Sequence, residues 1–257
     1  MIAGALSRMP RHGDGILMAQ ARGAGHGVLS SRNPAAMSDP TAPFDHPSTR
    51  PNAQPDTHTN PWTVLSRELR YETPWVKVFH HDVLRPNGSP GVYGTVELTT
   101  LAIGVLPIAE NGDTWLVGQW RFAVGHYSWE MVEGGIPLAG PKAVGPLAGA
   151  ADELREEAGL HAGRWLEIQR MEMSNSMTNE EVVLYLAWDL SPVPVAPEET
   201  EQLVVRRLPL RDALAMALAG EIQDAMTVAA LLRVRLMHLE GTLPPDLAPQ
   251  VAAGFGG

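Results

Sequence analysis

The chain contains no cysteine, so it can form neither a disulfide framework nor a thiolate metal site. It also has no apolar run near the roughly 18–20 residues that a membrane-spanning helix needs. The N-terminus carries Arg8 and Arg11 but no continuous apolar core of signal-peptide length. These absences favour a soluble protein of the cytoplasm with no membrane partner.

Basic residues are scarce relative to acidic ones. The 257 residues include 19 Lys and Arg against 29 Asp and Glu, which gives a formal net charge of −10. This surplus of negative charge argues against nucleic acid or an anionic membrane as the main partner, because both present phosphates. An anionic substrate would therefore need metal ions or a local group of arginines to hold it.

Residues 1–60 have little from which to build a core. They are rich in Gly, Pro, Ala, Ser and His, and Phe44 is their one aromatic residue. Such a segment cannot bury enough apolar area to offset the entropy lost on ordering. We therefore expect a disordered N-terminal extension over 1–60, a folded domain over 61–240 and a flexible C-terminal tail over 241–257.

From residue 61 onward, the pattern predicts many strands and few helices. The first convincing helix is Pro146–Ala158, which has proline at its start and Gly159 just past its end. The two further helices expected are Leu208–Ala219 and Asp224–Leu239, the second with Asp224 as its N-cap. Because strands and helices do not alternate, the fold class is α+β. The expected strands are Thr63–Tyr71, Pro74–Leu84, Val92–Leu98, Leu101–Ile108, Trp115–Trp120, Tyr127–Val132, Trp165–Met173 and Val182–Leu190.

Three carboxylates mark the first helix. Glu153, Glu156 and Glu157 are spaced i, i+3 and i+4, which places them on one side of a helix. Carboxylates this close repel one another unless a cation intervenes, and hard oxygen ligands suit Mg²⁺ or Mn²⁺. A solvated acidic face is the alternative for three glutamates taken alone. The upstream Gly134-Gly135 turn and the glycine at the helix end favour a site.

The stretch from Gly134 to Leu160 resembles the Nudix box, Gly-x5-Glu-x7-Arg-Glu-U-x-Glu-Glu-x-Gly-U, where U is a bulky apolar residue. Gly134 matches the first glycine of the box, and the segment from Glu153 to Leu160 matches its second half. The similarity extends over about Pro61–Leu236 and looks like the ADP-ribose pyrophosphatase branch of the Nudix hydrolases. The segments that carry it are Gln119-Trp120-Arg121-Phe122, residues 128–135, residues 174–180 and residues 220–225.

This resemblance implies a Nudix-type α/β/α sandwich with a mixed β-sheet and an N-terminal β-strand subdomain. It also implies a homodimer to which the N-terminal strands contribute. The implied activity is Mg²⁺-dependent (or Mn²⁺-dependent) hydrolysis of ADP-ribose, or a related nucleoside diphosphate sugar, to a nucleoside monophosphate and a sugar phosphate.

The resemblance also implies roles for particular residues. Glu153 and Glu157 would be the main metal ligands, and the backbone carbonyl of Glu133 would complete the set. Glu156 would share a metal or support its neighbours, and we count it as both a metal and a catalytic candidate. Glu180 would be the general base.

Three of these role assignments have alternatives. Glu181 is the fallback for the general base. Arg121 resembles an arginine that meets the substrate's phosphates or terminal sugar, with a surface ion pair as the other interpretation. Trp120 and Trp129 are suited to stacking on a base or sugar, but also to burial in the core.

The box departs from the family pattern in three ways. Four residues are inserted between Gly134 and Asp152, most simply around Pro141–Val144; the first box glutamate falls at Gly140; and Asp152 replaces the arginine. In the family that arginine orients the metal-binding glutamates, and losing such a partner typically costs about 10–100-fold in metal affinity or activity. Arg155, at i+3 from Asp152, and Lys142 are the candidates to neutralise the new charge.

The departures leave two functions open. The three surviving glutamates and Glu180 favour a working but modified enzyme. Asp152 and the missing box glutamate favour a catalytically weak Nudix domain that binds a nucleotide as a sensor or scaffold. A third interpretation is a structural acidic module without a ligand. The length of the resemblance argues against it.

Overall fold

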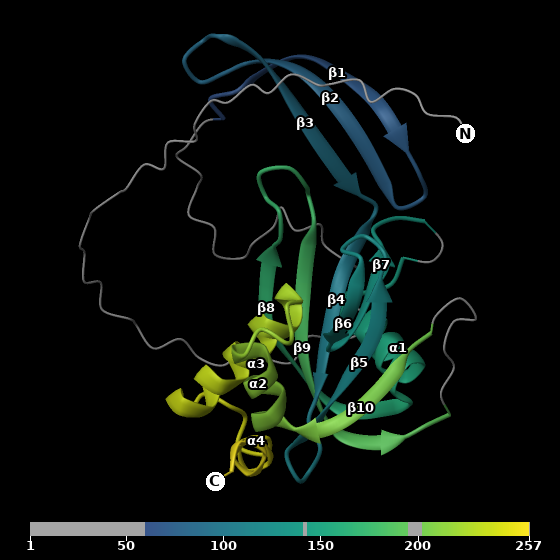
Figure 1. The fold of residues 1–257 in the computed structure, drawn as a ribbon, viewed down its shortest axis with the longest axis vertical. Helices are drawn as coiled ribbons and strands as arrows, with labels where there is room; N and C mark the ends of the chain where they lie inside the picture. Colours follow the sequence, from purple (N-terminus) through teal and green to yellow (C-terminus); the bar gives the residue numbers. More distant parts are fainter. Residues whose placement is uncertain (1–59, 141–142, 195–201, 257) are drawn as a thin grey trace, which may run out of the picture. The chain divides into compact units, whose positions relative to one another are not determined.

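The structure, a computed structural model, describes residues 60–140, 143–194 and 202–256 (Figure 1). Residues 1–59, for which we expect disorder, and Lys142, a candidate to neutralise Asp152, lie outside these ranges. In the part of the chain that is described, no helix is long and apolar enough to cross a membrane.

The N-terminal strands form a sheet of their own. Strands β1 (Thr63–Glu72), β2 (Val76–Leu84) and β3 (Pro90–Leu98) are antiparallel and lie in that order. The turn between β2 and β3 contains Gly88 at φ 80°, a conformation that favours glycine. Every residue of β1 is exposed. This sheet is the N-terminal strand subdomain that the sequence predicts.

The main sheet has four strands. Strands β4 (Thr100–Pro107), β7 (Val132–Pro137), β8 (Leu160–Glu172) and β9 (Glu181–Pro192) lie in the order β7-β4-β9-β8. The central pair β4 and β9 is parallel, and the two outer pairs are antiparallel. The predicted mixed sheet is therefore confirmed.

Both faces of this sheet are covered. Alternate residues of β9 enter two separate apolar clusters, Leu184 and Leu186 in one and Val183 and Tyr185 in the other. The second cluster includes Leu154 and its neighbours on α1 (Pro146–Ala158). The first includes residues of α2 (Leu210–Leu218), α3 (Ala225–Glu240) and α4 (Ala248–Phe255) (Figure 1). The result is the expected α/β/α sandwich.

A second, three-stranded sheet carries one wall of the site. It has the order β10-β5-β6, with β5 (Asp113–Arg121) between β6 (His126–Glu130) and β10 (Val204–Pro209). The sequence pattern did not predict β10, because four of its six residues are exposed and it has no apolar period. The strand predicted as Tyr127–Val132 breaks at Met131, and β7 begins at the next residue.

The helix ends follow their local signals. Helix α1 begins at Pro146, and Gly159 follows it in the left-handed conformation at φ 63°. Helix α3 has Asp224 as its N-cap, and the Asp224 side chain accepts a hydrogen bond from Thr227 N. Both predictions are confirmed.

The flexible tail predicted for residues 241–257 is wrong over residues 241–256. Leu243, Leu247 and Val251 are buried in the same cluster as α2 and α3, and α4 occupies this segment. The glycine, proline and alanine in residues 241–256 are typical of a loop, which is why the sequence predicted a flexible tail. The small residues instead permit close packing, since a β-carbon added at Gly112 would overlap the backbone of Gly254.

Candidate active site

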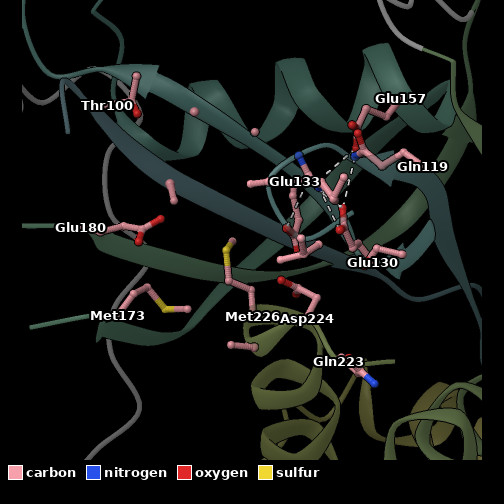
Figure 2. A pocket seen from close by; sticks show the side chains of 18 of the residues that line it. Thr100, Gln119, Glu130, Glu133, Glu157, Met173, Glu180, Gln223, Asp224 and Met226 are labelled. Atoms are coloured by element: carbon pink, nitrogen blue, oxygen red, sulfur yellow. Dashed lines mark hydrogen bonds and ion pairs between the residues drawn. The ribbon is translucent and has the colours of Figure 1, made fainter. Parts of the chain in front are cut away.

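A cavity of about 640 Å³ opens beside β7 and the start of α3 (Figure 2). Five acidic side chains line it, together with one arginine, Arg121, the single arginine or lysine among the described lining residues. The acidic residues are Glu130, Glu133, Glu157, Glu180 and Asp224. This excess of carboxyl groups makes the cavity suited to cations, or to anions bound through cations.

The α1 glutamates do not all behave alike. Glu157 is 6% exposed, and its Oε2 accepts a hydrogen bond of 3.0 Å from the backbone N of Glu133. The carboxyl group of Glu153 lies against Gly134, the next residue of β7. Glu156 is 32% exposed and lies 2.5 Å from Arg155 Nη2. The structure thus brings Glu153 and Glu157 to the box glycine and leaves Glu156 on an ion pair.

The side chain of Glu133 is buried in the cavity wall. Its Oε1 lies 3.2 Å from the Thr227 hydroxyl, and its carboxyl group faces Asp224. Burial, followed by the negative charge of Asp224, raises the pKa of Glu133 well above the ordinary glutamate value, although Arg121 acts in the opposite direction. The sequence assigned a role only to the backbone carbonyl of this residue.

Arg121 is held by a bidentate ion pair with Glu130. The distances from Nη2 and Nε of Arg121 to the Glu130 carboxylate are 2.6 and 2.9 Å, and Glu130 is only 3% exposed. This hydrogen bonding raises the pKa of Arg121 above its ordinary value. The ion pair that was the alternative interpretation of Arg121 is therefore present, but it lies at the cavity wall and not on the outer surface. Glu130 fixes the direction of the Arg121 guanidinium.

Glu180 lies at the end of the loop that connects β8 to β9. Its carboxylate points into the cavity from a different side than Glu157, with Glu133 between them in the view (Figure 2). Its fallback, Glu181, starts β9 and pairs with Glu172 across the sheet. Among the described residues, Glu181 does not line the cavity.

Hydrogen bonds to β3 fix the loop that carries Glu180. Val96 N donates to Met177 O at 2.9 Å. The side chain of Asn179 accepts from Leu98 N at 2.6 Å and donates to Leu98 O at 3.3 Å. The N-terminal sheet thus supports the loop beside the cavity.

The two tryptophans lie away from the cavity lining. Trp120 is 63% exposed, so its interpretation as a core residue is wrong. Trp129 packs against the larger core cluster and meets the Tyr127 ring edge-on, with centroids 5.6 Å apart. Core packing is therefore the better description of Trp129. Within the described residues, neither side chain lines the cavity.

Sequence reasoning missed Glu130, Asp224 and Thr227 as parts of the site. A usable signal was present, because polar side chains alternate along β5 and β6. Strand residues Gln119, Arg121, His126, Ser128 and Glu130 all line the cavity. For Asp224, its role as a helix cap explained the residue completely from local sequence, so its second position at the cavity wall was missed.

The residue that replaces the box arginine has a cationic neighbour. Arg155 Nη2 lies 3.7 Å from Asp152 and 2.5 Å from Glu156. Arg155 thus neutralises Asp152, as its i+3 spacing suggests. All three side chains are at least partly exposed, so solvent screens these ion pairs.

The donor groups fit a hard divalent cation in their chemistry. Carboxylate oxygens and a backbone carbonyl are the ligands that Mg²⁺ and Mn²⁺ prefer. Glu153 and Glu157 both reach β7 at Gly134 and Glu133. In the described ranges, however, no three acidic or histidine side chains are already drawn together into one metal-holding group. The ligands fit by type, and a cation would have to draw them closer.

Comparisons with known proteins agree with this architecture. A family described as "Nucleoside diphosphate sugar hydrolase N-terminal domain" matches residues 62–96, which cover β1, β2 and most of β3. The ADP-ribose pyrophosphatase of Mycobacterium tuberculosis (strain ATCC 25618 / H37Rv) is 32% identical over 135 residues, 52% of this chain and 64% of that protein. The ADP-ribose pyrophosphatase of Bacillus subtilis (strain 168) is 27% identical over 175 residues, 67% of this chain and 92% of that protein.

A solved structure described as "Crystal structure of ADP compounds hydrolase" superposes with a TM-score of 0.62 at 23% identity, over 71% of this chain and 97% of that one. This chain therefore shares its α/β/α fold with that solved structure. Together the matches confirm the resemblance to the ADP-ribose pyrophosphatase-like branch of the Nudix hydrolases. The matched region spans just under two thirds of the Mycobacterium relative.

Proposed function

We propose that the chain is a pyrophosphohydrolase that uses Mg²⁺, with Mn²⁺ as the alternative, to cleave ADP-ribose or a related nucleoside diphosphate sugar. The products are a nucleoside monophosphate and a sugar phosphate. One observation carries the proposal: Glu157 of α1 and Glu180 of the β8–β9 loop face a single cavity from different sides. Its volume of about 640 Å³ suits a small molecule.

Glu153, Glu157 and the backbone carbonyl of Glu133 would hold the metal, and Glu156 would share it or support its neighbours. When bound, a divalent cation neutralises the charge of the pyrophosphate and favours attack at phosphorus. The charge balance of the cavity supports this requirement. Among the described lining residues, the one arginine already pairs with Glu130, and four further carboxyl groups face the same space.

The protein's own residues would do the rest. Glu180 would take a proton from the attacking water, whose oxygen forms a new bond to one phosphorus while the bridging P–O bond breaks. The departing phosphate monoester keeps the bridging oxygen, and the oxygen of the water becomes the new oxygen on the phosphorus of the other monoester. Arg121, held in direction by Glu130, would contact the phosphates or the terminal sugar.

We also propose a cytoplasmic homodimer to which the N-terminal strands contribute. The exposure of β1 supports this, because Val64, Leu65 and Leu69 are 57%, 59% and 45% exposed. Light scattering coupled to size-exclusion chromatography tests the dimer. A monomer at micromolar concentration would contradict it.

The alternative function is a catalytically weak Nudix domain that binds a nucleotide as a sensor or scaffold. Asp152 in place of the box arginine and Gly140 in place of the first box glutamate favour it. The two functions differ in one measurement. A sensor binds a nucleotide sugar and leaves it intact.

A panel of nucleotide sugars with Mg²⁺ or Mn²⁺, with products separated by chromatography, tests the proposal. We expect release of a nucleoside monophosphate from ADP-ribose or a close relative, and no release in EDTA. Binding by calorimetry without product from any member of the panel would support the sensor. Neither binding nor turnover would contradict both functions.

A further inference from the structure

Thr227 connects helix α3 to the strand that carries the site. Its side chain is completely buried, and its hydroxyl has neighbours on two other segments. Met131 N donates to Thr227 Oγ1 at 2.8 Å, Asp224 Oδ2 lies 2.8 Å from the hydroxyl, and Glu133 Oε1 lies 3.2 Å from it. The backbone N of Thr227 also donates to Asp224 Oδ2, at 2.7 Å.

The hydroxyl both accepts and donates a hydrogen bond in this arrangement. A threonine hydroxyl has one hydrogen to donate and two lone pairs that accept. One lone pair accepts from the amide of Met131. The single hydrogen can be donated to one carboxylate oxygen at a time, and Asp224 Oδ2 at 2.8 Å is nearer than Glu133 Oε1 at 3.2 Å. Because Met131 is itself fully buried, water does not replace this acceptor if the hydroxyl is removed.

The segment that the hydroxyl holds leads directly to a proposed metal ligand. Met131 is the single residue between β6 and β7. Two residues later, the backbone N of Glu133 donates to Glu157 Oε2 at 3.0 Å. A hydroxyl on α3 thus fixes the strand that receives a carboxylate from α1.

We propose that Thr227 is a positioning residue of the active site, whose hydroxyl holds residues 131–133 where the Glu133 amide can orient the Glu157 carboxylate. This rests on the proposed function only in making Glu157 a metal ligand. Glu180, on another side of the cavity, has no part in it. A loss of positioning should therefore weaken metal binding more than it affects the base.

Two substitutions separate the hydroxyl from the shape of the side chain. Thr227→Val keeps the shape and removes the hydroxyl, whereas Thr227→Ser keeps the hydroxyl. Thr114→Val is the matched control, because Thr114 is also completely buried but its hydroxyl has no hydrogen-bond partner among the described residues. Thr227→Ala removes the same hydroxyl with less crowding and replaces the valine variant if that one does not fold.

Three readouts are taken on the full chain: amide hydrogen exchange of the peptide that contains residues 131–133, Mn²⁺ affinity by calorimetry, and steady-state kinetics at varied Mn²⁺. For Thr227→Val we expect faster exchange in that peptide and about tenfold weaker Mn²⁺ binding. Added Mn²⁺ should recover most of the turnover. Thr227→Ser and Thr114→Val should behave as the unmodified protein.

Unchanged exchange in Thr227→Val, or a loss that Thr227→Ser fails to prevent, would overturn the proposal. So would unchanged Mn²⁺ affinity in a valine variant whose exchange is faster. A failure of the proposed function looks different. The unmodified protein would then bind no Mn²⁺ and hydrolyse no nucleotide sugar, whatever residue stands at position 227.

Discussion

The carboxyl group of Glu153 occupies the space beside Gly134 that a β-carbon would fill. The two residues come from α1 and β7, nineteen positions apart in the sequence. Glycine is therefore required at position 134 because it has no side chain. The backbone conformation does not require glycine there, since the φ of Gly134 is not positive. The first glycine of the box makes room for one of the proposed metal ligands.

Gly134→Ala should displace Glu153 and lower activity by roughly tenfold or more, the scale of a disturbed metal ligand. Gly94→Ala is the control, on β3 and not among the described residues that line the cavity. A β-carbon at Gly94 would meet no heavy atom within 4 Å. Turnover at limiting Mg²⁺ and the melting temperature are measured for both variants. Equal activity of the two would show that Glu153 has no role beside Gly134.

Local signals explain what the sequence predicted well. Pro146 and Gly159 bound α1 because each restricts or permits a particular backbone conformation at a helix end. The same holds for Asp224, whose short side chain caps α3. Helix α4 also has a proline near its start and Gly256 in the left-handed conformation after its end, but in a segment rich in alanine, glycine and proline these signals do not distinguish a short helix from a loop. Its stability depends on contact with residues far away in the sequence, including the approach of Gly254 to Gly112.

For the site too, the parts that depend on local sequence could be predicted and the parts that depend on tertiary packing could not. The helical spacing that groups Glu153 with Glu157 is local, so the sequence contains it. The wall opposite α1 is assembled from β6 and the first turn of α3. Glu130 and Thr227 are almost a hundred residues apart in the sequence, and only tertiary packing brings their segments together.

Glu157→Gln should lower turnover by on the order of 100-fold, equivalent to about 2.7 kcal/mol. The amide keeps the shape and removes a charged ligand, so the fold should persist. EDTA should abolish the activity of the unmodified protein. The control is Glu110→Gln, at an exposed position outside the cavity lining. Activity that survives both EDTA and Glu157→Gln would exclude the metal mechanism.

Glu180→Gln should lower kcat by roughly 10²–10⁴-fold, because an amide cannot take a proton from water. Calorimetric Mn²⁺ affinity should stay unchanged, since the proposed ligands come from α1 and β7. Glu181→Gln, next along the chain but outside the cavity lining, is the matched control. If the Glu181 variant alone loses activity, the base is assigned one residue too early.

Glu133 should make stability depend on pH in the absence of metal. Burial raises its pKa in the folded protein above the unfolded value, so the folded state holds the proton more tightly. That stabilising contribution is complete below the unfolded pKa and is lost as pH rises through the folded pKa. Glu133→Gln should therefore gain melting temperature relative to the unmodified protein as pH rises from 5 to 8 in EDTA. A difference that stays constant with pH would contradict this.

Asp152→Arg tests whether the altered box is a defect or a rebuilt site. The family places a cation at this position, but here Arg155 lies 2.5 Å from Glu156 and 3.7 Å from Asp152. A second guanidinium would remove the attraction of Asp152 and repel Arg155 from Glu156. We therefore expect activity at limiting Mg²⁺ to fall several-fold, a modest change because the side chains are partly exposed.

The double variant Asp152→Arg with Arg155→Ala decides the matter. It leaves one cation, at the position where the family has it, so activity should recover relative to Asp152→Arg alone. The two substitutions would then be non-additive, as expected for side chains in direct contact. The opposite result would mean that Asp152 is a defect: Asp152→Arg would be more active than the unmodified protein at limiting Mg²⁺, and the difference would become smaller at saturating Mg²⁺. The arginine would then act in its family role, and Arg155 would be a bystander on the helix surface.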